Sequence, residues 1–389
     1  MDLPANPPDA PPTPTLRFDR MEWAGAFGDL GTLIPFLVAY VSLVKVDPSG
    51  ILFAFGVAMI VMGAYYRTPF PVQPMKAAGA AAATQAAHTL AVTAQAVYAA
   101  SLVTGLIWLI LGITGAAQRV ARWVSRPVTV GIVLGLGFGF MLEGIRMLSE
   151  GWWLGAIALI GTLLLLENRF VPAMFLVLVF GAAVALTQQP ELARELGALR
   201  PQWHAPTWAL GGMSWQDLVV GTLVLALPQV PLTLGNAVIA ITEENNRLFP
   251  ERPVDERRVA ISTGAMNLLG AAIGGVPMCH GAGGMAGHVR FGARTGGAPI
   301  IIGVLLLALA LFFSGSLETL LRLFPRPVLG AILFLTGVQL ALGSCDFSRD
   351  KGERFVTLAT AALSVWNVGA GFLFGICAYH LCKRGLIRI

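Results

Sequence analysis

Two short segments place prolines, glycines and polar side chains inside otherwise apolar sequence. The first is Phe70–Gly79, which contains Gln73 and Lys76, and the second is Gly274–Gly284, which contains His280. Proline suits the first turn of a helix, where unpaired N–H groups and a partial positive charge gather. Such helix N-termini bind anions, and an ammonium group beside them adds a full positive charge. The two segments therefore predict an anion site.

The second segment continues with small residues that would let an anion approach the backbone. We expect the N–H groups of Gly281, Ala282 and Gly283 to face the anion, because glycine imposes no side chain there. A lysine within an apolar region is costly and indicates function. The alternative is that Lys76 joins two helices through a carboxylate. We favour the anion site for Lys76.

Further polar residues lie in two segments expected to flank this site. The first, Phe27–Pro35, is expected to break at Gly31 and Pro35, and the second, Pro228–Ala237, is expected to unwind around two prolines. Hydroxyl and amide donors there suit an oxyanion. Ordinary interhelical hydrogen bonding is the alternative, and we favour it for Thr32 alone. The polar residues are Asp29 and Thr32 in the first segment and Gln229, Thr233 and Asn236 in the second.

The composition assigns these segments to a membrane protein. Of 389 residues, 56% are hydrophobic and only 12% are charged, whereas soluble domains carry about 25% charged residues. At about 20 residues per spanning helix, the chain has room for roughly 12 to 14 spans. This excludes a large catalytic domain outside the membrane. The class is a polytopic all-α membrane protein.

The apolar segments predict fourteen membrane segments. Two of them, the proline-led segments at 71–89 and 277–290, are expected to be half-spanning helices that meet near the middle of the membrane. The last apolar run is too long for one span, so we divide it near Asn367. The remaining segments are 27–44, 51–65, 96–116, 128–142, 152–166, 171–186, 218–242, 259–276, 300–313, 328–342 and 355–382.

An internal duplication accounts for these segments as seven plus seven. The sequence Ser125–Gly137 recurs as Pro325–Gly337, and the two half-spanning segments recur at a similar offset. An odd number of spans per repeat inverts the second repeat, as in secondary transporters. The domain boundaries predicted are a proline-rich disordered cytoplasmic tail at 1–20, repeats at 21–190 and 213–389, and an extracytoplasmic loop at 191–212.

The distribution of basic residues gives the orientation. Lysines and arginines gather in the loops that are cytoplasmic if both termini are cytoplasmic, as the positive-inside rule requires. The repeated Arg126 and Arg326 then fall on opposite faces, as inversion predicts. The net charge of +5 is therefore a topology signal, and no nucleic-acid partner is expected.

The sequence contains no pattern typical of an enzyme or of an ATP-driven pump. Its four cysteines lack metal-ligand spacing, and neither a His-Glu-x-x-His, a P-loop nor a Gly-x-Ser-x-Gly motif occurs. We expect no metal centre, no cofactor and no catalytic residues.

At four segments the sequence resembles the molybdate transporter family, which is related to the sulfate permeases. The segments are Phe27–Phe36, Pro71–Lys76, Pro228–Val238 and Gly275–Arg294. The resemblance implies the seven-plus-seven inverted-repeat fold, with a core domain of spans 1–4 and 8–11 moving against a gate domain of spans 5–7 and 12–14. The sequence departs from the sulfate-permease pattern in one respect: it ends just after the last predicted span, so we expect no cytoplasmic STAS domain.

The expected function is secondary import of molybdate, a tetrahedral dianion, across the inner membrane. Alternatives are a sulfate, other oxyanion or nucleobase permease and an uncoupled anion channel, and tungstate is not distinguished from molybdate. Coupling to protons or sodium, facilitated diffusion and homodimer formation all stay open. The candidate proton carriers are Asp29, Glu243 and His280. Asp29 could instead form a permanent ion pair with Lys76.

Overall fold

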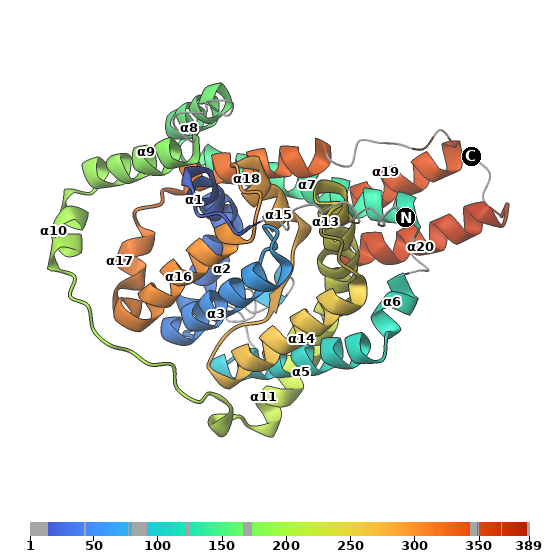
Figure 1. Cartoon of the computed structure of the whole chain (residues 1–389), viewed down its shortest axis with the longest axis horizontal. Coiled ribbons are helices and arrows are strands. Elements are labelled where there is room, and N and C mark those ends of the chain that lie inside the picture. Colours follow the sequence, from blue (N-terminus) through green and yellow to red (C-terminus); the bar gives the residue numbers. More distant parts are fainter. Residues whose placement is uncertain are drawn as a thin grey trace, which may run out of the picture.

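The computed structural model describes residues 15–42, 44–76, 78–79, 92–121, 125–165, 173–342, 348, 350–366 and 368–386. Within these residues the protein is almost entirely helical (Figure 1). Most of the predicted disordered tail and most of the first predicted half-spanning helix lie outside the described residues. Of the tail, residues 15–20 are described, and the first helix begins at Arg20.

The helices of the first half follow the predicted apolar segments. Their bounds are α1 (Arg20–Ala26), the 3-10 turn η1 (Phe27–Asp29), α2 (Leu30–Ser42), α3 (Pro48–Tyr66), the short strand β1 (Gln73–Pro74), α5 (Ala94–Ile113), α6 (Ala116–Ala121), α7 (Arg126–Ser149), α8 (Trp152–Leu165), α9 (Ala173–Gln188) and α10 (Pro190–Ala198).

The second half repeats this order. Its elements are η2 (Leu210–Gly212), α11 (Trp215–Val220), η3 (Gly221–Ala226), α12 (Leu227–Leu232), η4 (Thr233–Ala240), α13 (Ile241–Leu248), α14 (Glu256–Ala272), β2 (Met278–Cys279), α15 (Ala282–Arg290), α16 (Gly297–Phe312), η5 (Ser314–Ser316), α17 (Leu317–Leu321), α18 (Arg326–Leu342), α19 (Lys351–Trp366) and α20 (Val368–Lys383).

The two halves pack against each other in matched pairs. Helices α7 and α18, which carry the repeated sequence, lie side by side, as do α5 and α14 (Figure 1). Helix α3 packs on α16, and this contact is the counterpart of α14 on α5 when the halves are exchanged. The contact of α7 with α19 has its counterpart in α18 with α8. Each contact between the halves thus has an equivalent contact when the two repeats are exchanged, which is what a two-fold relation between them produces.

Glycines allow these helix pairs to approach closely. A Cβ at Gly56 of α3 would lie 2.8 Å from the carbonyl oxygen of Gly303 in α16, and the reverse contact is also 2.8 Å. At the α7–α18 contact, a Cβ at Gly144 would lie 2.8 Å from the carbonyl oxygen of Gly330. Small residues are the usual means of close packing between membrane helices, where the hydrophobic effect contributes little.

Length and composition bear directly on how many helices cross the membrane. Within the described ranges, three single helices are long and apolar enough to do so, namely α3, α5 and α7. Two bent pairs, α9 with α10 and α16 with η5 and α17, raise the number to five. The count of fourteen spans therefore stays a prediction. The predicted division of the last apolar run into two helices is confirmed by the packing of α19 against α20.

Two local predictions are wrong. The first span changes its helical form at η1 rather than at Gly31 and Pro35, and α2 continues through both positions. The segment around Gln229 is not unwound, because α11 to α13 form one continuous helical run in which η3 and η4 are π-helical. Wider π turns accommodate the prolines there without breaking the helix.

Candidate functional site

The two proline-led segments meet in a two-stranded antiparallel ladder. In β1 and β2, Gln73 is paired with Cys279 and Pro74 with Met278. The ladder is extended where the N–H of Met75 donates to the carbonyl of Pro277 over 2.8 Å. Helical structure follows each strand, at Lys76 on one side and in α15 on the other. The start of each predicted half-spanning helix is thereby held beside the other.

A buried polar cluster joins the first strand to the first span. The Gln73 side-chain amide donates to Oδ1 of Asp29 over 2.6 Å and to Oγ1 of Thr32 over 2.8 Å. Thr32 in turn donates to Asp29, both to its carbonyl oxygen and to its carboxylate. Among the described residues, Oδ2 of Asp29 and Oε1 of Gln73 have no hydrogen-bond partner. The cluster therefore fixes Gln73 and leaves one oxygen of each group available.

The ammonium group of Lys76 is buried against an aromatic ring. Its Nζ atom lies 3.7 Å from the centroid of the Phe140 ring in α7. Within the described part of the chain this nitrogen has no hydrogen-bond partner. A cation over an aromatic face is attracted to the ring quadrupole, but the ring accepts no strong hydrogen bond. The permanent ion pair with Asp29 is thus not formed in this structure, and no described residue accepts a hydrogen bond from Lys76.

Two of the three polar residues predicted from the second repeat hold the first half-spanning helix in place. The Gln229 side chain accepts from the N–H of Ala78 over 3.1 Å and donates to Oγ1 of Thr233 over 3.0 Å. Thr233 also contacts the sulfur of Met75 at 3.9 Å. The third residue, Asn236, is buried, and its side-chain oxygen has no partner among the residues described.

The N-terminus of α15 is lined by glycines that leave little room for any side chain. Gly281 is the N-cap, and a Cβ there would collide with Oε1 of Gln73. A Cβ at Gly283 would strike the Phe140 ring, and one at Gly284 would lie 2.8 Å from Oδ2 of Asp29. The first N–H groups of a helix have no partner within the helix. Those of α15 therefore begin next to Gln73, Asp29 and Phe140.

His280 precedes Gly281 and so lies beside the cradle, defined as the first turn of α15 (Gly281–Gly284) together with Gln73, Asp29 and Phe140. Both nitrogens of its ring are hydrogen-bonded within the protein. Nδ1 lies 2.8 Å from the carbonyl oxygen of Pro71, and Nε2 lies 2.9 Å from Oγ of Ser262 in α14. Both ring nitrogens therefore have protein partners, and the ring is not free to bind an anion directly. Of the predicted contact between His280 and the substrate, only a contact through the backbone of His280 stays open.

The structure brings together all eleven predicted site residues and adds others. Phe140 contacts both Lys76 and the Gly283 position, although it lies in an apolar helix with no distinguishing sequence signal. Asn267 fixes β2, because its side-chain amide donates to the carbonyl of Met278 and accepts from the N–H of the same residue, over 2.6 and 2.8 Å. An amide in the middle of an apolar run was the available signal for Asn267.

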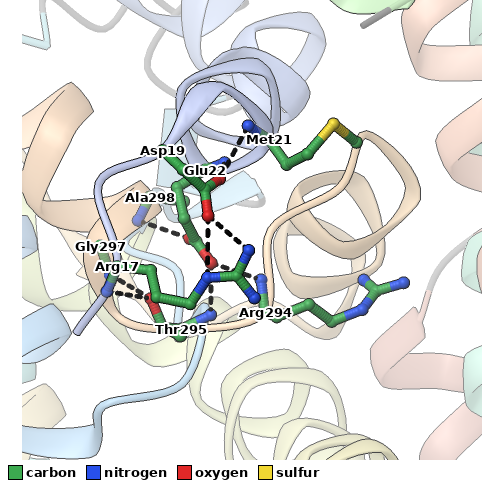
Figure 2. Close-up of polar contacts among 8 residues, drawn as sticks. All are labelled: Arg17, Asp19, Met21, Glu22, Arg294, Thr295, Gly297 and Ala298. Atoms are coloured by element: carbon green, nitrogen blue, oxygen red, sulfur yellow. Dashed lines mark hydrogen bonds and ion pairs between the residues drawn. The ribbon is translucent and has the colours of Figure 1, made fainter. Parts of the chain in front are cut away.

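A second buried carboxylate ties the first span to the segment after α15. Glu22 in α1 is 1% exposed and accepts from the N–H groups of Arg294 and Thr295 over 2.9 Å each and of Ala298 over 3.1 Å. Figure 2 shows this carboxylate reaching across to the start of α16. It completes the N-terminus of α16, whose own N-cap, Gly296, offers no side-chain acceptor.

The described residues contain no group of three or more His, Cys, Asp or Glu side chains that could hold a metal ion. The donors described at the cradle are the first backbone N–H groups of α15 and the Lys76 ammonium group, because the amide nitrogens of Gln73 and Gln229 already donate within the protein. This set suits an anion that accepts hydrogen bonds from several directions.

Comparison with known proteins identifies the family. A family model described as "Molybdate transporter of MFS superfamily" matches residues 21–140 and 221–340. The chain belongs to this molybdate transporter family. It is 31% identical to "Molybdate transporter 2" of Arabidopsis thaliana, with 93% of this chain and 87% of the relative aligned. It is 30% identical to "Molybdate transporter 1" of Chlamydomonas reinhardtii, over 91% of this chain and 90% of the relative.

The two matched segments are offset by 200 residues, which is also the offset between the repeated sequences of α7 and α18. The family resemblance predicted from the four motifs is confirmed. The matched segments contain all the predicted site residues, from Asp29 to Gly283.

Solved structures establish the fold relationship. The transmembrane domain of the cyanobacterial bicarbonate transporter BicA aligns over 91% of this chain and 97% of its own, with a TM-score of 0.59 and 16% identity. Murine Slc26a9, an anion transporter in the inward-facing state, aligns over 97% of this chain and 70% of its own, with a TM-score of 0.65 and 12% identity. The protein is thus a polytopic helical membrane protein with the fold of these transporters.

Proposed function

We propose that this chain carries molybdate into the cell across the inner membrane as a secondary transporter, with both termini on the cytoplasmic side. The observation that carries the proposal is the convergence of the Lys76 ammonium group, which has no hydrogen-bond partner in the described ranges, with the start of α15 across the β1–β2 ladder. The relatives named as molybdate transporters support molybdate as the substrate.

The proposed site offers less positive charge than a tetrahedral dianion carries negative charge. Lys76 supplies one positive charge, and the N-terminus of α15 supplies a partial one. Asp29 lies beside the first turn of α15, where its Oδ2 atom would be 2.8 Å from a Cβ at Gly284. An ionised carboxylate there would repel the dianion, so binding favours the protonated form of Asp29. The substrate and a proton are in this way able to enter together.

Some source of energy is needed for accumulation. Moving two negative charges inward against about 100 mV costs about 4.6 kcal/mol, at about 2.3 kcal/mol per charge. Co-transport of protons or sodium would supply this energy, and consumption of molybdate inside the cell would replace it under facilitated diffusion. A homodimer is compatible with each of these schemes and is required by none.

The test is uptake of molybdate into proteoliposomes that contain the purified protein. Saturable uptake that sulfate inhibits only at large excess supports a molybdate transporter. Equal competition by sulfate would indicate a general oxyanion permease. A conductive current that is not saturable would indicate an anion channel and contradict the proposal.

A further inference from the structure

Three buried polar side chains form a chain that ends beside the cradle. The hydroxyl of Tyr66, the last residue of α3, lies 2.8 Å from Oγ of Ser262 in α14. The same Oγ atom lies 2.9 Å from Nε2 of His280, the residue before Gly281. All three residues are buried. The chain joins two helices of different repeats to the backbone that begins α15.

The hydrogen-bond partners fix where the protons lie. The Pro71 carbonyl can only accept, so Nδ1 of His280 carries a hydrogen and donates it over 2.8 Å. In the neutral ring, Nε2 therefore accepts from Ser262, and Ser262 accepts from Tyr66. The Ser262 hydroxyl also has a second acceptor, the carbonyl oxygen of Val259 at 3.0 Å. If Nε2 becomes protonated and donates to Ser262, the serine hydroxyl can turn to Val259. Both protonation states of the ring are thus satisfied.

The other end of the chain opens on a cavity of about 500 Å³. This cavity lies where α3 ends and where the segment between α13 and α14 passes, on the side proposed to be cytoplasmic. Around the chain, the Tyr66 ring stacks on Phe70 at 3.8 Å between centroids, and Phe70 meets the His280 ring at 5.0 Å. The residues lining the cavity are Tyr65, Tyr66, Glu251, Arg252, Pro253, Val254 and Arg258.

The groups around His280 determine what its protonation would mean. No carboxylate is hydrogen-bonded to the ring among the described residues, because its partners are Pro71 and Ser262. A buried imidazolium is therefore unfavourable until a negative charge arrives nearby. The titratable and charged groups of the packed elements are Tyr65 and Tyr66 on α3, Asp29 on η1, Lys76 after β1, Glu256, Arg257 and Arg258 on α14, Cys279 on β2, and His288 and Arg290 on α15.

We propose that Tyr66, Ser262 and His280 form a proton path between this cavity and the oxyanion site. The inference rests on the proposed function, because the bound dianion is what makes the imidazolium favourable. On loading, water in the cavity gives a proton to the Tyr66 oxygen as the Tyr66 hydroxyl proton passes to Ser262. The Ser262 proton passes to Nε2 of His280. Release of the anion reverses each transfer and returns the proton to the cavity.

Binding of the anion and protonation of His280 are then coupled, and each strengthens the other. The path affects the speed of proton transfer, whereas His280 sets its amount. Removing the Tyr66 hydroxyl should therefore slow proton uptake without abolishing it. Removing the imidazole should abolish the share of the uptake that His280 accepts and leave the share of Asp29.

The experiment mixes the full-length purified protein in nanodiscs with sodium molybdate and records a pH-indicator dye by stopped flow. The wild type should take up about one proton more per anion bound than His280→Gln, since one imidazole accepts one proton. Tyr66→Phe keeps the ring stacked on Phe70 and should lower the rate by about tenfold or more at unchanged amplitude, because a proton cannot pass a missing hydroxyl. Tyr65→Phe, which alters a neighbouring exposed tyrosine at the same cavity, is the matched control and should leave rate and amplitude unchanged.

Calorimetry with molybdate on the same samples separates the possible failures. Anion binding without proton uptake by the wild type would overturn the path and leave the proposed function intact. A wild-type rate in Tyr66→Phe, or a wild-type amplitude in His280→Gln, would also overturn it. Absence of molybdate binding by the folded wild type would refute the proposed function itself.

Discussion

Replacement of Glu22 by alanine tests how strongly the first span is tied to the start of α16. The Glu22 carboxylate accepts three backbone N–H groups over 2.9 to 3.1 Å in a fully buried position (Figure 2). A hydrogen bond to a charged group contributes about 1.5 to 3 kcal/mol, and a buried donor left without a partner costs a similar amount. Since the three bonds share one acceptor, we expect a combined loss of about 4 kcal/mol rather than the full sum.

The assay is thermal unfolding of the purified protein in detergent. At about 2 to 4 °C per kcal/mol, the Glu22→Ala protein should unfold about 10 °C below the wild type. Glu22→Gln should fall between the two, because the amide keeps one accepting oxygen but turns an NH2 group toward backbone donors. Glu150→Ala is the control, since Glu150 forms an exposed pair with Arg326, and such pairs contribute about 0 to 1 kcal/mol. Equal unfolding temperatures for Glu22→Ala and Glu150→Ala would refute the reasoning.

Three further changes test the site itself. Lys76→Met should weaken molybdate binding, measured by calorimetry, by about tenfold or more, because it removes the full positive charge. Gel filtration checks that the variant is folded. An unchanged affinity would leave Lys76 a structural role only. Gly283→Ala should abolish uptake into proteoliposomes, because its Cβ collides with the Phe140 ring, and uptake at the wild-type rate would show that this contact does not matter. Asp29→Asn should keep the fold, because the amide oxygen can still accept from Gln73. The variant should still exchange molybdate across the membrane, but an inward proton gradient should no longer accelerate its uptake of molybdate. An undiminished response to that gradient would exclude Asp29 as the proton carrier.

The fold and the meeting of the two proline-led segments were predictable because their signals are local or repeated. Apolar runs identify helices, and the repeat of Ser125–Gly137 at Pro325–Gly337 indicates the two-fold arrangement that the packing of α7 on α18 displays. Proline followed by glycine and a polar residue marks the starts of both half-spanning segments. Such patterns depend only on the chemistry of neighbouring residues.

What the sequence did not predict depends on distant contacts. The occupation of both His280 nitrogens requires Pro71 and Ser262, which are far from it in the chain. The contact of Lys76 with Phe140 depends on how α7 crosses the first half-spanning segment. The prolines near Gln229 are consistent with either a broken helix or π turns, and only the surrounding packing selects the latter.

The most direct test of the account is to locate the bound oxyanion. Tungstate, which has nearly the size and charge of molybdate, scatters strongly enough to be placed by cryo-electron microscopy or by anomalous diffraction. We predict one strong peak between Lys76 and the start of α15, within hydrogen-bond reach of the backbone at Gly281 to Gly283, and its loss in Lys76→Met. A peak elsewhere, such as the cavity beside Arg252 and Arg258, with none at the start of α15, would contradict it.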